Sequence, residues 1–114
     1  MSPKLSTHVL DLVTGKPASG MRIELWSLEG KHTLLRAVTT NLDGRTETPL
    51  LSGAEFKVGS YELLFFVKDY FVTHHRDSPF LDRVPVRFAI TDAHASYHVP
   101  LLVAPYGVSS YRGS

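Results

Sequence analysis

The sequence predicts an all-β protein, an antiparallel β-sandwich of about seven or eight short strands with one short helix. Segments in which apolar and polar residues alternate recur at roughly ten-residue spacing. Gly, Pro and Asn separate these segments, and no internal repeat, low-complexity segment or linker interrupts them. We therefore expect a single domain over residues 1–114, long enough to bury a continuous core without disulfides or a structural metal.

The first half of the chain contains three predicted strands, over residues 5–12, 21–28 and 34–40. The first alternates loosely, with Val9 and Asp11 on one face and His8 and Leu10 on the other. The second alternates cleanly, which predicts a half-buried strand. The third is rich in β-branched residues and ends in a turn over residues 41–44.

The second half begins with the most apolar predicted strand, over residues 60–67. A short helical turn over residues 68–75 follows it. Another strand is predicted further on, where every second residue is a large apolar one: Val84, Val86 and Phe88. A loop over residues 92–96 leads into the last element.

Residues 97–114 predict a terminal hairpin. Two apolar runs flank a break at which Pro105 fixes φ and Gly107 is free to adopt a positive φ. Val99 and its same-face neighbours are all aliphatic and belong to the core, so we expect His98 to point away from it. An aromatic residue, a guanidinium and a glycine follow from Tyr111 onward, which is unusual for a polar, disordered tail.

Composition excludes several classes of protein. The chain has no cysteine, so a thiol nucleophile and a cysteine zinc site are excluded. The formal net charge is +1 without runs of Lys or Arg, and nucleic acid and anionic membranes are not expected partners. No apolar stretch approaches the ~20 residues of a spanning helix, and residues 1–4 lack the apolar part of a secretory signal. We expect a soluble, cytoplasmic protein with a small-molecule site.

Two histidines and an arginine are the candidate catalytic residues. His8 and His98 lie near opposite ends of the chain, and the first and last strands of a sandwich often lie close together. Imidazole titrates near neutral pH and a guanidinium keeps its charge, so convergence with Arg45 would create an acid–base and oxyanion site. A histidine on a strand is more often a hydrogen-bonded, partly buried group, and Arg45 follows a turn where a solvated side chain is common. Residue pattern alone leaves both interpretations open.

The other histidine and serine pairs are weaker candidates for a metal site or a nucleophile. His74 and His75 are adjacent and lack a third ligand at metal-binding spacing, so no metal site is expected there. Ser109 and Ser110 lack the nucleophile elbow of a serine hydrolase.

Four motifs, in order along the chain, resemble the signature of the 5-hydroxyisourate hydrolases, or transthyretin-related proteins. They are LSTHVLD at residues 5–11, TNLDGRT at residues 40–46, YHVPLL at residues 97–102 and YRGS at residues 111–114. The resemblance covers essentially the whole chain and implies the transthyretin fold. It also implies that the histidine of the first motif, the arginine of the second, the histidine of the third and the final tetrapeptide form the active site. The implied catalytic residues are His8, Arg45, His98 and Ser114, and the implied substrate-binding residues are His8, Arg45, Tyr111, Arg112 and Gly113.

The resemblance further implies a reaction: hydrolysis of 5-hydroxyisourate, the product of urate oxidation, at a lactam bond of its six-membered ring. The product would be 2-oxo-4-hydroxy-4-carboxy-5-ureidoimidazoline, in purine degradation, with no cofactor and no metal. Relatives form homotetramers, as dimers of dimers around a central channel, and we expect His8, Leu10, His98 and Tyr111 to face it. Which histidine is the general base stays open, as does a peroxisomal location if the source is eukaryotic.

Two other functions remain as alternatives. The first is a transthyretin-like protein that binds a hormone without catalysis, and the polar set of His8, Arg45 and His98 argues against it. The second is a structural sandwich module in which these side chains have no catalytic role.

Overall fold

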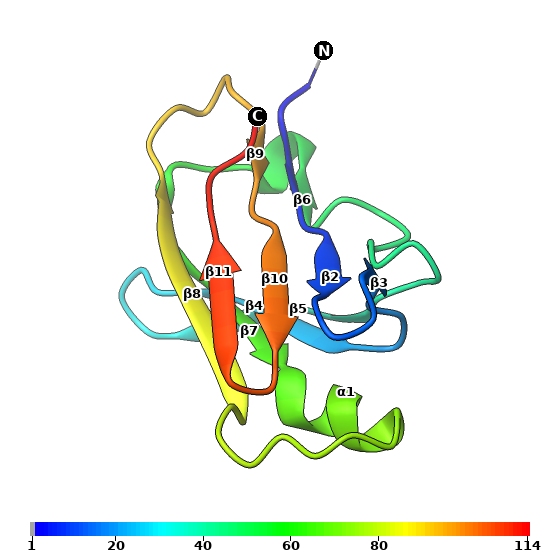
Figure 1. Ribbon diagram of the computed structural model, residues 1–114. Helices are drawn as coiled ribbons and strands as arrows, with labels where there is room; N and C mark the ends of the chain where they lie inside the picture. The colour runs from blue at the N-terminus through cyan, green and yellow to red at the C-terminus, as the bar shows by residue number, and fades with distance from the viewer. Residues whose placement is uncertain (1) are drawn as a thin grey trace.

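The computed structural model describes residues 2–114, which form two layers of β-strands with a short helix at one end (Figure 1). The strands are β1 (Lys4–Ser6), β2 (Val9–Asp11), β3 (Lys16–Pro17), β4 (Arg22–Ser27), β5 (Thr33–Thr39), β6 (Leu51–Ser52), β7 (Gly59–Phe66), β8 (Arg83–Ile90), β9 (Tyr97–His98), β10 (Leu101–Ala104) and β11 (Gly107–Ser110). The helices are α1 (Val67–Thr73) and the 3-10 turn η1 (Gly53–Glu55). Within residues 2–114, neither helix is long and apolar enough to cross a membrane. The predicted all-β sandwich with one short α-helix is confirmed.

The back layer in Figure 1 is a four-stranded antiparallel sheet in the order β5-β4-β7-β8. The alternation predicted for residues 21–28 is confirmed, because Ile23 and Leu25 are buried and Arg22 is exposed. Leu25 pairs with Leu63 of β7, so one face of both strands enters the core. β5 is an edge strand and is exposed along most of its length.

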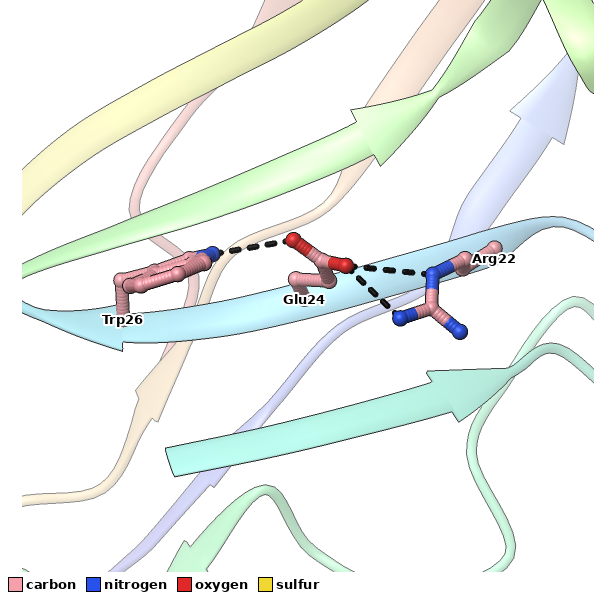
Figure 2. A network of polar contacts seen from close by, with 3 residues as sticks. All are labelled: Arg22, Glu24 and Trp26. Atoms are coloured by element: carbon pink, nitrogen blue, oxygen red, sulfur yellow. Dashed lines mark hydrogen bonds and ion pairs between the residues drawn. The ribbon is translucent and has the colours of Figure 1, made fainter. Parts of the chain in front are cut away.

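The outer face of this sheet carries a polar network centred on Glu24 (Figure 2). Its carboxylate accepts hydrogen bonds from Arg22 Nη2 at 2.7 Å and from Trp26 Nε1 at 3.0 Å. The hydrogen bond from Arg22 lowers the pKa of Glu24 and outweighs the opposing effect of burial. Because residues two apart share a face of a strand, the alternation that buries Ile23 and Leu25 also aligns these three side chains.

The front layer contains two sheets, β6-β1-β9 and β11-β10-β2-β3. β1 pairs with β9 in parallel, and β2 pairs with β10 in parallel, whereas the other strand pairs are antiparallel. The expectation of a wholly antiparallel sandwich is therefore wrong for these two pairs. Parallel strands need a long crossover connection, and the strands of the back layer form that connection here.

Two predicted strands of the front layer are each interrupted in the middle. Residues 5–12 form β1 and β2 with a gap at Thr7 and His8, and the first strand of the terminal hairpin has a gap at Val99 and Pro100. Across these gaps, Thr7 Oγ1 donates to the Val99 carbonyl at 2.7 Å. Residues 2–114 contain eleven strand segments, more than the predicted seven or eight, because of these two interruptions and the short strands β3 and β6.

The terminal hairpin is confirmed as β10 and β11. Gly107 pairs with Ala104 at the start of β11 and does not have the positive φ that the break had suggested. β11 ends at Ser110, so Tyr111 lies beyond the strand.

The core lies between the two layers and is almost entirely apolar. Its largest fully buried side chains are Phe65, Phe71, Leu5, Met21, Ile23, Leu25, Leu50, Leu63, Ile90, Leu101, Val9 and Val67. Asp11, at the end of β2, is a buried carboxylate, and its Oδ2 accepts a hydrogen bond from the Tyr70 hydroxyl at 2.8 Å. Burial raises the pKa of Tyr70, which keeps the phenol protonated as the donor. The hydrogen bond between Tyr70 and Asp11 thus connects α1 to β2.

Candidate active site

The interruptions in β1–β2 and β9–β10 lie side by side, because the parallel pairing continues on either side of them. Ser6 is opposite His98 before the gaps, and Val9 is opposite Leu101 after them. The His8 carbonyl accepts a hydrogen bond from the Leu101 amide at 2.9 Å. The two predicted histidines therefore come from neighbouring strands, although 90 positions separate them in the sequence.

Gly44 brings Arg45 close to these strand interruptions. The Val9 amide donates to the Gly44 carbonyl at 2.9 Å, and Gly44 has a φ of 72°. A Cβ atom at this position would lie 2.5 Å from the Val9 carbonyl oxygen, so only glycine permits the close approach. The turn itself is held by Asn41, whose Oδ1 accepts from the amides of Asp43 at 2.9 Å and Arg45 at 3.2 Å. Arg45 consequently follows directly on the contact with the start of β2.

The Arg45 side chain is exposed and forms no salt bridge within residues 2–114. A hollow of about 180 Å³ opens beside it. The residues that line this hollow are Ser6, Thr7, Arg45, Thr46, Glu47, Thr48 and Pro49. An unpaired guanidinium at the edge of a hollow can bind an electron-rich or anionic group through its planar donors.

His98 is half-buried, and its Nδ1 lies 2.9 Å from the Ser6 hydroxyl. Burial lowers the pKa of His98 below its ordinary value of 6.5, and the charges of Arg45 and His8 lower it further. At pH 7 the ring is thus a neutral imidazole, which can accept a proton or donate a hydrogen bond. Arg45 and His8 affect the pKa of His98 because the three side chains lie close to one another.

The tail over residues 111–114 reaches the site through Gly113. The His98 amide donates to the Gly113 carbonyl at 3.2 Å, and the Gly113 amide donates to the His98 carbonyl at 2.6 Å. A Cβ atom on Gly113 would lie 3.1 Å from Cδ2 of the imidazole. Ser114, the fourth predicted catalytic residue, therefore follows immediately on a backbone bridge to His98.

Arg112 and Tyr111 have different surroundings from the other predicted site residues. The Arg112 guanidinium lies over the Tyr97 ring, 4.5 Å from its centroid, and Nη2 donates to the Ser96 carbonyl at 3.1 Å. Successive side chains of a strand point to opposite faces, so Tyr97 and Arg112 lie on the face of β9 opposite His98. Tyr111 is 60% exposed and lines a separate apolar hollow with Phe88. Neither side chain lines the Arg45 hollow, and the lining of that hollow does not include His8 or His98 either.

Ser6 is the site residue that the sequence analysis missed. It occupies the first motif two positions before His8, so the two share a strand face. The shared face of Ser6 and His8 could be predicted from the sequence. The contact of Ser6 with His98, however, depends on the pairing of β1 with β9.

His74 has a local partner. His74 Nδ1 lies 2.8 Å from the Tyr70 carbonyl at the end of α1, and its ring packs against the Tyr70 ring. Among residues 2–114, no group of three His, Asp or Glu side chains is arranged to hold a metal ion.

A two-layered sandwich with two histidines and an arginine at its interrupted strands defines a transthyretin-like protein with a polar site. The chain belongs to the HIUase/Transthyretin family, whose model matches residues 5–113. A relative from Rhizobium meliloti (strain 1021), named 5-hydroxyisourate hydrolase 2, is 52% identical and the match covers 99% of this chain and 98% of the relative.

Solved structures show the same likeness. A crystal structure of (S)-allantoin synthase has a TM-score of 0.94 at 45% identity, covering 99% of this chain and 44% of that one. The structure of Klebsiella pneumoniae 5-hydroxyisourate hydrolase has a TM-score of 0.84 at 37% identity, covering 98% and 99%. Sea bream transthyretin in complex with thyroxine, at 24% identity and a TM-score of 0.88 over 96% and 94% of the two chains, shares the fold.

Proposed function

We propose that this chain hydrolyses 5-hydroxyisourate and opens its six-membered ring at a lactam bond. The observation that carries the proposal is the convergence of His8, Arg45 and His98 where β1–β2 and β9–β10 are interrupted. The names of the relatives from R. meliloti and K. pneumoniae support the choice of substrate.

The proposed chemistry needs a base for water and a charge to stabilise the developing oxyanion. The lowered pKa of His98 keeps its imidazole neutral near pH 7, the form that can accept a proton. We assign His8 and His98 together to water activation and proton transfer, with either one as the base. Arg45, which lacks an ion-pair partner within residues 2–114, binds the electron-rich ring and stabilises negative charge in the transition state.

The tail completes the proposed site. Gly113 lies against His98, and we assign to Ser114, the next residue, the role of orienting a histidine. The contacts of Arg112 with Tyr97 and Ser96 support a role in holding the tail on β9. Direct binding of substrate by Tyr111 or Arg112 would require a rearrangement or a neighbouring subunit.

A homotetramer, built as a dimer of dimers, accounts for the open shape of the site. Ligand pockets usually enclose about 300–1,000 Å³, whereas the hollow beside Arg45 is smaller and open to solvent. His8, Leu10 and His98 are half-buried on the outer face of the front layer, where a second copy could cover them. β8 and β11 are edge strands whose outer edges have no neighbouring strand within residues 2–114, and these edges offer a route to the dimer.

The direct test is the ultraviolet decay of 5-hydroxyisourate generated from urate by urate oxidase. We expect the wild-type protein to accelerate this decay and His98→Asn to lose the acceleration. His94→Asn, in an exposed loop, is the matched control and should keep it. Decay no faster than the spontaneous reaction, with folded wild-type protein, would overturn the proposal and favour a binding function such as that of sea bream transthyretin.

A further inference from the structure

The Ser6 hydroxyl is hydrogen-bonded to the imidazole of His98. Its Oγ lies 2.9 Å from Nδ1, and within residues 2–114 it makes no other hydrogen bond. The Ser6 backbone is fixed as well, because its carbonyl accepts from the Val99 amide at 2.9 Å and Ser6 is paired with His98 across the parallel strands. The hydroxyl therefore projects from a rigid position.

Gly113 occupies the opposite edge of the same ring. A Cβ atom built on Gly113 would meet Cδ2 of the imidazole at 3.1 Å, which places the tail backbone beside the carbon edge. Nδ1 and Cδ2 are the two ring atoms bonded to Cγ, so they exchange places when the ring flips. A flip would put a C–H group against the Ser6 oxygen and Nδ1 against the tail, and the hydrogen bond to Ser6 would be lost.

We propose that Ser6 is a positioning residue that fixes the ring orientation of His98, with Nδ1 toward the Ser6 hydroxyl, and so leaves Nε2 as the nitrogen that exchanges a proton. This inference rests on the proposed hydrolase function for its catalytic meaning. The hydroxyl can donate to or accept from Nδ1, so the contact holds the ring in one orientation in either tautomer and keeps Nδ1 engaged with the fold. Ser6 does not touch the reacting atoms, and its effect on turnover acts entirely through the ring of His98.

The test compares wild-type protein with Ser6→Ala and a matched control, Ser52→Ala. Ser52 lies on β6, the neighbour of β1 on the side away from β9, and is also half-buried. Its hydroxyl makes no hydrogen bond within residues 2–114, so the control removes the same atom without an imidazole partner. In each protein, nuclear Overhauser effects from the Hδ2 proton of His98 report whether the Cδ2 edge of the ring faces Gly113, as it does in the structure. The kcat and KM for 5-hydroxyisourate are measured on the same samples.

We expect a strong contact between His98 Hδ2 and Gly113 in wild type and Ser52→Ala, and a weaker one in Ser6→Ala. We also expect kcat to fall by about tenfold in Ser6→Ala, with little change in KM, as for other residues that orient a functional histidine. An unchanged ring orientation in Ser6→Ala, or a loss of kcat shared by Ser52→Ala, would overturn the inference. If wild-type protein does not hydrolyse 5-hydroxyisourate, the proposed function fails, while the spectra still decide whether Ser6 fixes the ring.

Discussion

Gly113 and His98 are joined by a two-way backbone bridge, and the imidazole of His98 fills the space where a side chain of residue 113 would lie. The two hydrogen bonds measure 3.2 and 2.6 Å, and an added Cβ atom would be 3.1 Å from Cδ2 and 3.2 Å from Cβ of His98. The tail and the proposed catalytic ring are therefore one packed unit.

Gly113→Ala should disturb this unit without unfolding the protein. The imidazole or the tail must move by a few tenths of an ångström, and we expect kcat to fall on the order of tenfold because small displacements of reacting groups are costly. Gly107→Ala is the control, since nothing lies within 4 Å of its added Cβ atom and its φ is not positive. Steady-state kinetics and thermal unfolding test both variants. Equal activity of the two would contradict the predicted packing effect.

Gly44→Ala should lower stability and separate Arg45 from His8. The new Cβ would approach the Val9 carbonyl oxygen to 2.5 Å in addition to the strain of a positive φ. We expect a loss of about 2–3 kcal/mol in the free energy of unfolding. Gly15 has the same φ of 72°, but nothing lies within 4 Å of an added Cβ atom, so Gly15→Ala carries the backbone strain without the clash. Urea denaturation of both variants therefore measures the two effects separately. A loss no larger than that of Gly15→Ala would show that the contact is unimportant.

Arg45→Gln should raise the pKa of His98, because the Arg45 charge disfavours a protonated imidazole. Titration of His98 by NMR measures this change directly. We expect kcat to fall on the order of a hundredfold, as when one donor to an oxyanion is removed. Arg87→Gln is the control, since Arg87 pairs with Glu62 in the back layer and should leave the His98 titration unaltered. A His98 pKa unchanged in Arg45→Gln would refute the inferred proximity.

The free energy of unfolding should depend on pH through His98. Because the folded-state pKa is lowered, the unfolded chain binds more protons between that value and about 6.5. Stability therefore rises with pH across this interval and levels off above it. His98→Asn should remove this part of the pH dependence, whereas His32→Asn, at an exposed position, should retain it. Urea denaturation across the interval is the measurement, and identical pH profiles for all three proteins would exclude His98 as the source.

Leu10→Glu should weaken the proposed association between dimers. Leu10 is half-buried on the face that carries His8, where a charge would be costly to cover with a second copy. We expect sedimentation velocity to show a smaller species and the decay assay to show lower turnover. Leu34→Glu on exposed β5 is the control and should leave the assembly intact. Unchanged sedimentation of Leu10→Glu would place the interface elsewhere.

Much of the local structure follows from the sequence. Val9 and Asp11 are buried while His8 and Leu10 face outward, as the alternation over residues 5–12 predicts. Val99 and Leu101 likewise enter the core and leave His98 half-buried on the other face. These predictions hold because the two-residue period of a strand is a local property of the backbone. The four motifs identified the family correctly, which the match over residues 5–113 confirms.

The contacts of the candidate site depend on tertiary structure. Ser6 and His98 lie 92 positions apart, and their hydrogen bond exists because β1 and β9 pair in parallel across the length of the chain. Alternation within one strand specifies which face is buried but carries no information about its neighbour or its direction. The family resemblance implies that Arg112 binds substrate, and within one chain its guanidinium lies over the Tyr97 ring. The sequence by itself thus determined which side chains face outward, and the pairing of distant strands decided which of them meet.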